Sequence, residues 1–241
     1  FFVAKVNLKA QEALGFNYLR PLQLAYESPK FMLPIRLGMV NADGAQELYV
    51  YALTRTGRVE TRNYRTVKMP SGMDLPTSIK DDFGKFYTAM FTRQLKNNNS
   101  KVALLEYAWD MAWCDPCAAD PLSKEQLREL GAYWLDETRS KRNAGSNVFV
   151  TRLHLRYDQE NFPEDLMFVE TGDRQNFQGR YVIRHPWTGS AQCPAAQEYK
   201  AGLSQRHAQE AKTLANLTGW KIDDIPNGTE PVDTDVSPSW W

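Results

Sequence analysis

The stretch QELYVYALTR, residues 46–55, has the clearest strand pattern in the sequence. Its side chains alternate between a small apolar set and a larger, mostly aromatic set: Leu48, Val50 and Ala52 against Tyr49, Tyr51 and Leu53. Such alternation predicts a β-strand that carries the two sets on opposite faces. Turn-forming residues flank the stretch, at positions 41–44 and 56–57, and they predict that neighbouring strands fold back beside it as an antiparallel meander.

Further strand patterns and one amphipathic helix follow from the spacing of apolar residues. Strand patterns occupy residues 1–8, 19–28, 31–40, 101–109, 148–158, 165–172 and 179–187. Residues 81–96 have helical spacing instead, with five large side chains on one face: Phe83, Phe86, Tyr87, Met90 and Phe91.

Two more helices are marked by their ends. Ser123 and Gln126 form a capping-box pattern, which predicts a short helix that ends at Gly131. A long helix is predicted over residues 194–217, because Gly219 supplies its stop signal. The predicted fold class is therefore α+β, with an antiparallel, meander-type sheet and two main helices packed on it.

The two ends of the chain differ from the body between them. Residues 1–221 are predicted to form a single domain, and residues 222–241 an extended acidic tail rich in Pro and Asp that ends in Trp240 and Trp241. We expect these two tryptophans to bind a partner, and removal of residues 226–241 to weaken that association without unfolding the domain. Because the sequence opens inside a strand pattern and without Met, we also expect the domain to continue N-terminally of residue 1.

Composition excludes some classes of function. Lys and Arg number 29 and Asp and Glu number 29, so the formal net charge is zero, which argues against a nucleic-acid partner. The sequence lacks an apolar run long enough for a transmembrane helix. It also lacks a nucleophile elbow, a phosphate loop and a dinucleotide fingerprint, so no cofactor is expected.

The segment Trp113-Cys-Asp-Pro-Cys117 permits three interpretations. In the first interpretation, the segment is the active site of a thiol oxidoreductase that follows a strand, with Cys114 as nucleophile and Cys117 as resolving thiol. The following capping box at Ser123 opposes this, because it starts the helix too late to lower the pKa of Cys114.

The second interpretation is structural, and we favour it. Cys114 and Cys117 bridge each other, or one pairs with Cys193 and the other with a cysteine upstream of residue 1. The third interpretation is a zinc site made of the three cysteines and one histidine, but Cys193 has no paired cysteine at knuckle spacing. We therefore expect Cys114, Cys117 and Cys193 to be disulfide-forming residues, and we expect no metal site.

Other polar residues give weaker signals. His154, His185 and His207 form no His-x-x-x-His or His-Glu pair, and a lone strand histidine is more often hydrogen-bonded than catalytic. The acidic stretches 158–160 and 173–176 have oxygen ligands for calcium without the spacing of a dedicated loop, so plain turns are expected.

Several strings in the chain are long and specific, among them NYLRPLQLAYESPKFMLPIRLGMVNADG (17–44), EYAWDMAWCDPCAADPLS (106–123), FPEDLMFVETGDRQNFQGRYVIRHPWTGS (162–190) and LTGWKIDDI (217–225). They resemble a family of uncharacterised exported bacterial proteins, known only as a domain of unknown function. Members look longer at the N-terminus, with a signal sequence and further cysteines. The resemblance implies the C-terminal part of a periplasmic or secreted protein, and it supplies no activity.

These observations predict an exported, non-enzymatic structural or binding protein. We expect it to be an accessory subunit of an envelope or membrane-associated complex, whose partner is another protein or the segment before residue 1. Two alternatives stay open at this point. One is the thiol oxidoreductase that uses Cys114 and Cys117. The other is a carbohydrate or small-ligand binder that uses exposed aromatic side chains.

Overall fold

The computed structural model describes residues 2–5, 13, 23–40, 42–113, 120–136, 147–190 and 193–224. They divide into two compact units. Unit 1 is made of Phe1–Lys68 and Ser100–Gln178, and unit 2 of Met69–Asn99 and Gly179–Trp241. The chain contains helices together with sheets whose strands pair mostly antiparallel, which confirms the predicted α+β class.

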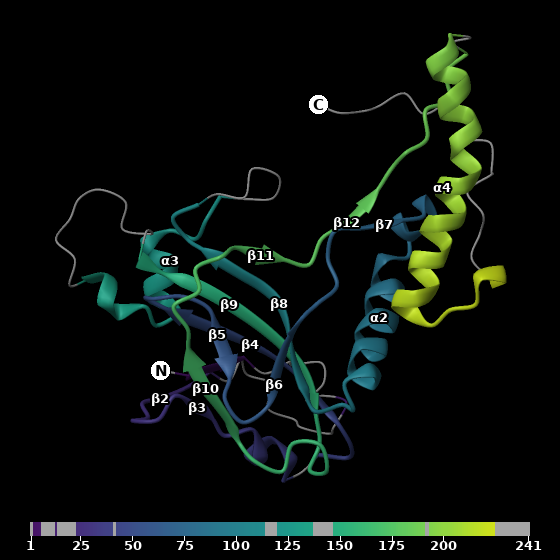
Figure 1. The fold of residues 1–241 in the computed structure, drawn as a ribbon. Coiled ribbons are helices and arrows are strands. Elements are labelled where there is room, and N and C mark those ends of the chain that lie inside the picture. Colours follow the sequence, from purple (N-terminus) through teal and green to yellow (C-terminus); the bar gives the residue numbers. More distant parts are fainter. Residues whose placement is uncertain are drawn as a thin grey trace. The chain divides into compact units, whose positions relative to one another are not determined.

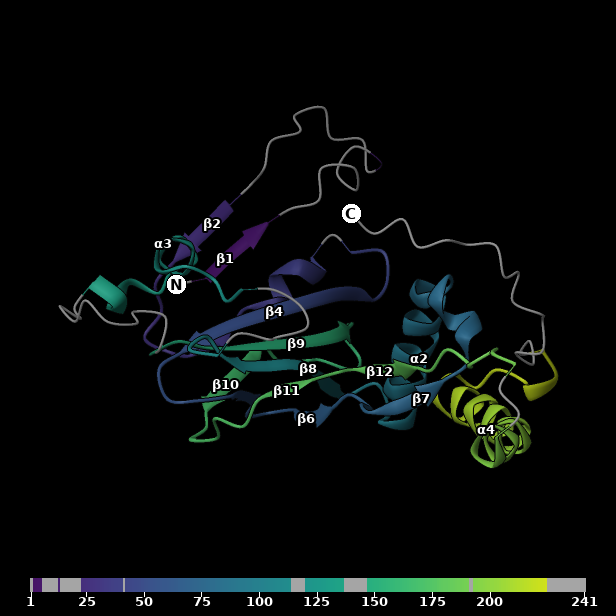
Figure 2. The ribbon, with the colours of Figure 1, turned by 90° about the horizontal axis from the view of Figure 1, so that it is seen from above.

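Unit 1 is built on a sheet whose strands come from distant parts of the chain. Its order is β11-β8-β9-β4, and β6 pairs with β8 in parallel. Figures 1 and 2 show these strands side by side. Their bounds are β4 Gln46–Thr54, β6 Arg65–Lys68, β8 Val102–Asp110, β9 Phe149–Tyr157 and β11 Phe177–Gln178. The parallel pair and the non-sequential order make this a mixed sheet, more complex than the meander that local turns predict.

A second layer covers one face of that sheet. It is a three-stranded sheet in the order β3-β10-β5, with bounds Met32–Leu33, Leu166–Glu170 and Val59–Thr61. Val50 of β4, Leu153 of β9 and Phe168 of β10 belong to the single apolar cluster between the layers. Unit 1 also contains an antiparallel hairpin of β1 (Phe2–Lys5) and β2 (Gln23–Tyr26).

Part of the opposite face is closed by a short helix. The predicted capping box is present, because the Ser123 side chain accepts from Gln126 N and begins α3 (Lys124–Glu129). A 3-10 helix, η3 (Tyr133–Asp136), follows. Leu127 and Leu135 from these helices pack with Val150 of β9 in a separate apolar cluster.

The strand predicted over residues 31–40 is mostly a helix. β3 covers only Met32–Leu33, and a 3-10 helix, η1 (Ile35–Met39), begins directly after Pro34. Proline has no N–H to donate to a neighbouring strand, so the ladder stops there. Ile35 is then buried in the core of unit 1.

Unit 2 combines two helices with a short parallel strand pair. β7 (Met73–Leu75) pairs with β12 (Tyr181–Ile183), and a 3-10 helix, η2 (Thr77–Lys80), follows β7. The predicted helices are present as α2 (Phe83–Asn97) and α4 (Pro194–Thr218), which pack against each other, and η5 (Ile222–Asp224) follows. α2 buries Phe86, Met90, Phe91 and Leu95.

α4 ends where the sequence predicts. Gly219 has a φ of 80°, a left-handed conformation that glycine adopts without a steric penalty. In the part of the chain that the structure describes, no helix has both the length and the apolar character needed to cross a bilayer.

Candidate functional site

The second face of the β8-β9-β4 sheet carries a group of aromatic and charged side chains, here called the tyrosine face: Glu47, Tyr49, Tyr51, Glu106, Arg152 and His154. The strand register brings them together, since Tyr49 lies opposite His154 and Tyr51 lies opposite Arg152. Tyr49 is 43% exposed and Tyr51 is 58% exposed, whereas the alternating neighbours Val50 and Ala52 are buried. The alternation predicted for residues 46–55 is thus confirmed, and its aromatic set faces outward.

His154 lies beneath the tyrosines and is only 1% exposed. Its Nδ1 is 2.7 Å from Glu106 Oε1, and its Nε2 is 3.1 Å from Glu47 Oε1. Both ring nitrogens of His154 are therefore within hydrogen-bond distance of a carboxylate oxygen. The arrangement confirms that this strand histidine is hydrogen-bonded.

A β-bulge in β8 places Glu106 in this cluster. The β8–β9 register shifts between Leu105 and Tyr107, so Glu106 is an extra residue in its strand. Bulges of this kind redirect a side chain. Glu106 is 9% exposed, and its second oxygen lies 2.8 Å from Arg152 Nε in an ion pair. One buried carboxylate therefore holds two basic side chains of β9.

Arg152 and His154 in turn hold the tyrosine rings. The Arg152 guanidinium carbon lies 4.8 Å from the centroid of the Tyr49 ring and 5.5 Å from that of Tyr51. The Tyr49 ring stacks on His154 at 3.9 Å between centroids. Burial, helped by the carboxylates of Glu47 and Glu106, raises the pKa of the Tyr49 phenol above its ordinary value. Two exposed rings are thus fixed from below by a buried ionic cluster.

This geometry suits binding better than acid–base catalysis. Both ring nitrogens of His154 face carboxylates, and the side chain is almost fully covered, so a substrate has no direct access to it. The groups that solvent does reach are the two tyrosines, the edge of Arg152 and the half-exposed Glu47. Tyr and Arg are enriched in protein interfaces and at their energetic centres.

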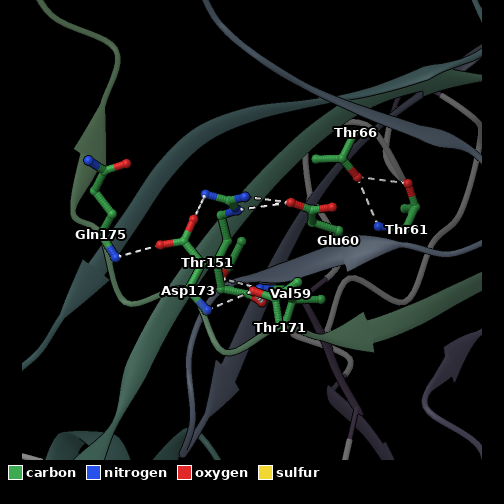
Figure 3. A network of polar contacts seen from close by, with 9 residues as sticks. Val59, Glu60, Thr61, Thr66, Thr151, Thr171, Asp173 and Gln175 are labelled. Carbon is green, nitrogen blue, oxygen red and sulfur yellow. Dashed lines mark hydrogen bonds and ion pairs between the residues drawn. The ribbon is translucent and has the colours of Figure 1, made fainter.

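A second polar cluster joins the loops at one end of the two layers (Figure 3). Asp173 follows β10 and accepts from Gln175 N at 2.8 Å and from Arg58 Nη1 at 2.6 Å. The Gln175 N–H and the Arg58 guanidinium lower the pKa of the Asp173 carboxyl. Arg58 also pairs with Glu60 of β5 at 2.5 Å.

The same cluster ties the second layer to the main sheet. Val59 N donates to the Thr151 hydroxyl of β9 at 3.0 Å (Figure 3). Gly57 lies so close to this loop that a Cβ would stand 2.5 Å from Asp173 O, so only glycine fits there. Asp173 is engaged by its own turn and by Arg58, so it joins the loop after β10 to the chain just before β5.

The chain before the cysteine motif forms a firmly held turn. Asp110, the last residue of β8, accepts from Ala112 N at 3.0 Å and pairs with Arg174 at 2.6 Å. Trp109 donates from its indole nitrogen to Trp113 O at 2.7 Å. Cys114 and Cys117 themselves lie outside the described residues, so their predicted bridge and the redox alternative stay predictions.

Of the other predicted site residues, Cys193 is the one that the structure describes. Cys193 is a free, exposed cysteine at the N-cap of α4 in unit 2, and the structure shows no disulfide for it. Trp240 and Trp241 lie outside the described residues. Within the described ranges, no group of three or more His, Cys, Asp and Glu side chains is arranged to hold a metal ion.

Unit 2 has a wide groove of about 650 Å³ along α2. Its basic lining residues are Lys85, Arg93 and Lys96, and Gly219 and Trp220 from the end of α4 complete it. Lys85 already pairs with Asp82 at 2.7 Å. The groove is open to solvent, and among the described residues none that lines it has a buried side-chain N or O atom without a hydrogen-bond partner.

Sequence patterns alone miss the residues that build the tyrosine face. A signal for them exists in the apolar string VALLEYAW, residues 102–109, in which Glu106 is the single charged residue. A second signal is the alternation of Arg152, His154 and Arg156 along one side of β9. A buried carboxylate needs a basic partner, so these two patterns point to each other.

A family model matches residues 1–169, and its description reads "Uncharacterized protein conserved in bacteria (DUF2330)". The match includes β4, β8 and β9 and therefore the whole tyrosine face. It ends before the strings of residues 171–190 and 217–225 that also support the resemblance. Neither the curated proteins nor the solved structures contain a match to this chain.

Proposed function

The chain belongs to this family of uncharacterized proteins conserved in bacteria, and from its geometry we propose that it is a non-enzymatic binding protein of the bacterial envelope that holds a protein partner on the tyrosine face. The observation that carries the proposal is the pair of exposed rings of Tyr49 and Tyr51, fixed by Arg152 over a buried His154–Glu106 pair. Location in the envelope rests on the resemblance of the long sequence strings to exported proteins.

Rigidity supports binding as the role of this face. A protein surface loses affinity when side chains must be ordered on contact, at about 0.5–1.5 kcal/mol for each flexible side chain. Here Tyr49 is already stacked on His154, and Arg152 is already paired with Glu106. The ordering cost has therefore been met during folding, and the rings are presented in a fixed position.

The chemistry of the face selects a protein partner of mixed polarity. Two phenol hydroxyls and the guanidinium edge supply hydrogen-bond donors, while the ring faces supply apolar area. A centre of Tyr and Arg surrounded by exposed polar side chains is typical of protein–protein interfaces. An accessory subunit that docks on a larger envelope complex fits this description.

Photo-crosslinking in the producing bacterium tests the proposal. We would place a photoreactive phenylalanine analogue at Tyr51 in the full-length protein, and a matched control at Tyr133, which is 47% exposed on η3. The proposal predicts a discrete product between position 51 and a different envelope protein, absent from position 133; a product between two copies of this chain does not count for or against it. Products shared by both positions, or no product with a protein from either, would contradict it.

A second experiment tests whether the Arg152 guanidinium is needed to hold the tyrosine rings for binding. Arg152→Lys keeps the positive charge but loses the planar group that lies over both rings. The yield of the position-51 product should fall in this variant. The location is tested separately, by fractionation of cells that produce the full-length protein: recovery in the cytoplasm alone would reject an envelope role.

A further inference from the structure

We propose that β4 is a dimerisation edge, at which two copies of this chain pair antiparallel about a twofold axis at Val50 and join their sheets into one. This inference does not depend on the protein partner of the tyrosine face. It rests on the position of β4 in the sheet, on the composition of its edge and on its fit to its own copy.

β4 is the outermost strand of its sheet and is long. All nine residues of Gln46–Thr54 pair with β9 without a register shift. Among the described residues, no backbone N–H or C=O of this strand bonds to anything beyond β9. An edge of this kind presents a full row of unpaired backbone groups, which another strand can pair with.

The opposite edge of the sheet carries ordinary protections against pairing, whereas the β4 strand itself carries almost none of them. Beyond β8 lie β11, with only two residues, and β6, which carries Arg65 and Lys68 at its ends. Short strands and charged side chains are ordinary protections against edge pairing, as are prolines and bulges. β4 has no proline, glycine or lysine, and Glu47 is its single charged residue.

The side chains of β4 match those of a second copy when the axis passes through Val50. Tyr49 of each copy then lies opposite Tyr51 of the other, which gives two cross-strand tyrosine pairs on the exposed face. On the buried face, Leu48 lies opposite Ala52, so large and small apolar side chains alternate. Apolar and aromatic rows therefore continue across the junction on their own faces.

The charges also agree with this register. Glu47 near one end of β4 is brought toward the partner's opposite end, where the exposed Arg55 follows Thr54. The twofold axis repeats this Glu–Arg approach at the other end of the junction. No two charges of like sign meet along the strand, because Gln46–Thr54 contains only one charged residue.

Sedimentation of the full-length protein over a wide concentration range tests the proposal, together with Tyr51→Lys. Tyr51 is exposed, and a lysine there places two cations at the junction. The matched control is Val169→Lys, also exposed on a strand, but on β10 between β3 and β5. We expect a reversible dimer that Tyr51→Lys weakens by about tenfold or more and Val169→Lys leaves unchanged.

Hydrogen exchange on the unmodified protein provides a readout that needs no variant. Amides of residues 46–54 should exchange more slowly at dimer-forming concentrations than at dilution, while the protection of β8 amides stays the same. A protein that remains monomeric throughout overturns the proposal, even when it captures a strand of another protein. So does a dimer that is indifferent to Tyr51→Lys or that protects a different segment.

Discussion

The two faces of the β8-β9-β4 sheet are made from alternate residues of the same strands, yet they are stabilised by different physics. The inner face packs Val50 and Leu153 in an apolar cluster with Phe168 of the second layer. The outer face holds Tyr49 and Tyr51 in place through His154 and Arg152, which both contact the buried Glu106 carboxylate. The inner face is stabilised by apolar area that is removed from water. The outer face uses buried polar contacts to fix the positions of side chains that stay in contact with water.

The two faces differ in how strictly they require particular side chains. Apolar packing tolerates many side chains of suitable size, so the inner face constrains composition more than identity. The outer face requires particular partners, because a buried charge without its counter-charge is costly. Substitutions on the two faces should therefore differ in kind as well as in size.

The largest effect is expected on the inner face. Leu153 is fully buried in the apolar cluster, and Leu153→Ala should lower the free energy of unfolding by about 3 kcal/mol, because it removes buried methyl groups and leaves a cavity. Urea unfolding measures the change. Val169→Ala, an exposed position on β10, is the control and should change the stability by less than about 0.5 kcal/mol. Equal effects would show that the inner face is not the core.

The next effect is expected beneath the tyrosines. Glu106→Gln keeps the shape of the side chain but leaves His154 and Arg152 without their buried counter-charge, and should cost about 2 kcal/mol. The control is Glu47→Gln on the same cluster, where the carboxylate is 44% exposed and solvent screens it, so the loss should stay below about 1 kcal/mol. If both variants unfold alike, burial of Glu106 does not organise this face.

Much of the secondary structure can be predicted from the sequence, because the signals are local. The alternation over residues 46–55, the apolar spacing of residues 81–96 and the stop at Gly219 each lie within one element, and the structure confirms them. The parallel pairs β6–β8 and β7–β12 could not be predicted in this way. They join segments far apart in the chain, and nothing local states which strand pairs with which.

The outer face could not be predicted from the sequence for the same reason, because it also depends on pairing between distant strands. Glu106 points into the cluster because β8 bulges against β9, and the bulge depends on the register between two strands that are separated by a long segment. The strand prediction for residues 31–40 failed for the reverse reason, since Pro34 is a local signal and ended β3 after two residues. Cys114, Cys117 and the two terminal tryptophans fall outside the described residues.

A smaller effect is expected where the second layer is tied to the inner face. Gln175 N and Arg58 lower the pKa of Asp173 in the folded state. The carboxylate therefore contributes its full stabilisation at pH values above its pKa in the unfolded state, about 3.9. This stabilisation is lost as the pH falls through the lower pKa of the folded state. Asp173→Asn should remove about 1 kcal/mol or less at neutral pH, because the carboxylate is partly exposed.

The pH series separates this group from the other carboxylates. The stability difference between the natural protein and Asp173→Asn should shrink as the pH is lowered below about 4, measured by urea unfolding at each pH. Asp43→Asn, at an exposed residue in the turn before β4, is measured beside it as the control for replacing a surface carboxylate by an amide. A difference that is constant with pH would mean that the Asp173 charge does not hold the loop.

The smallest effect concerns Tyr49 and has the opposite sign in pH. Its pKa is raised by burial and by Glu47 and Glu106, so the folded state keeps the phenol proton longer than the unfolded state does. The stabilisation that results is complete at pH values below the phenol pKa of the unfolded state, about 10. It is lost as the pH rises through the higher pKa of the folded state. Because the ring is 43% exposed, we expect about 0.5 kcal/mol or less.

Tyr49→Phe isolates that contribution, since phenylalanine keeps the ring on His154 and removes the titrating hydroxyl. The natural protein should lose stability more steeply than Tyr49→Phe between pH values near 9 and near 11, with Tyr51→Phe as the more exposed reference. A parallel loss in the natural protein and Tyr49→Phe would place the Tyr49 hydroxyl in open water. The outer face would then present rings that the ionic cluster does not hold, and the contrast between the two faces would reduce to one of burial.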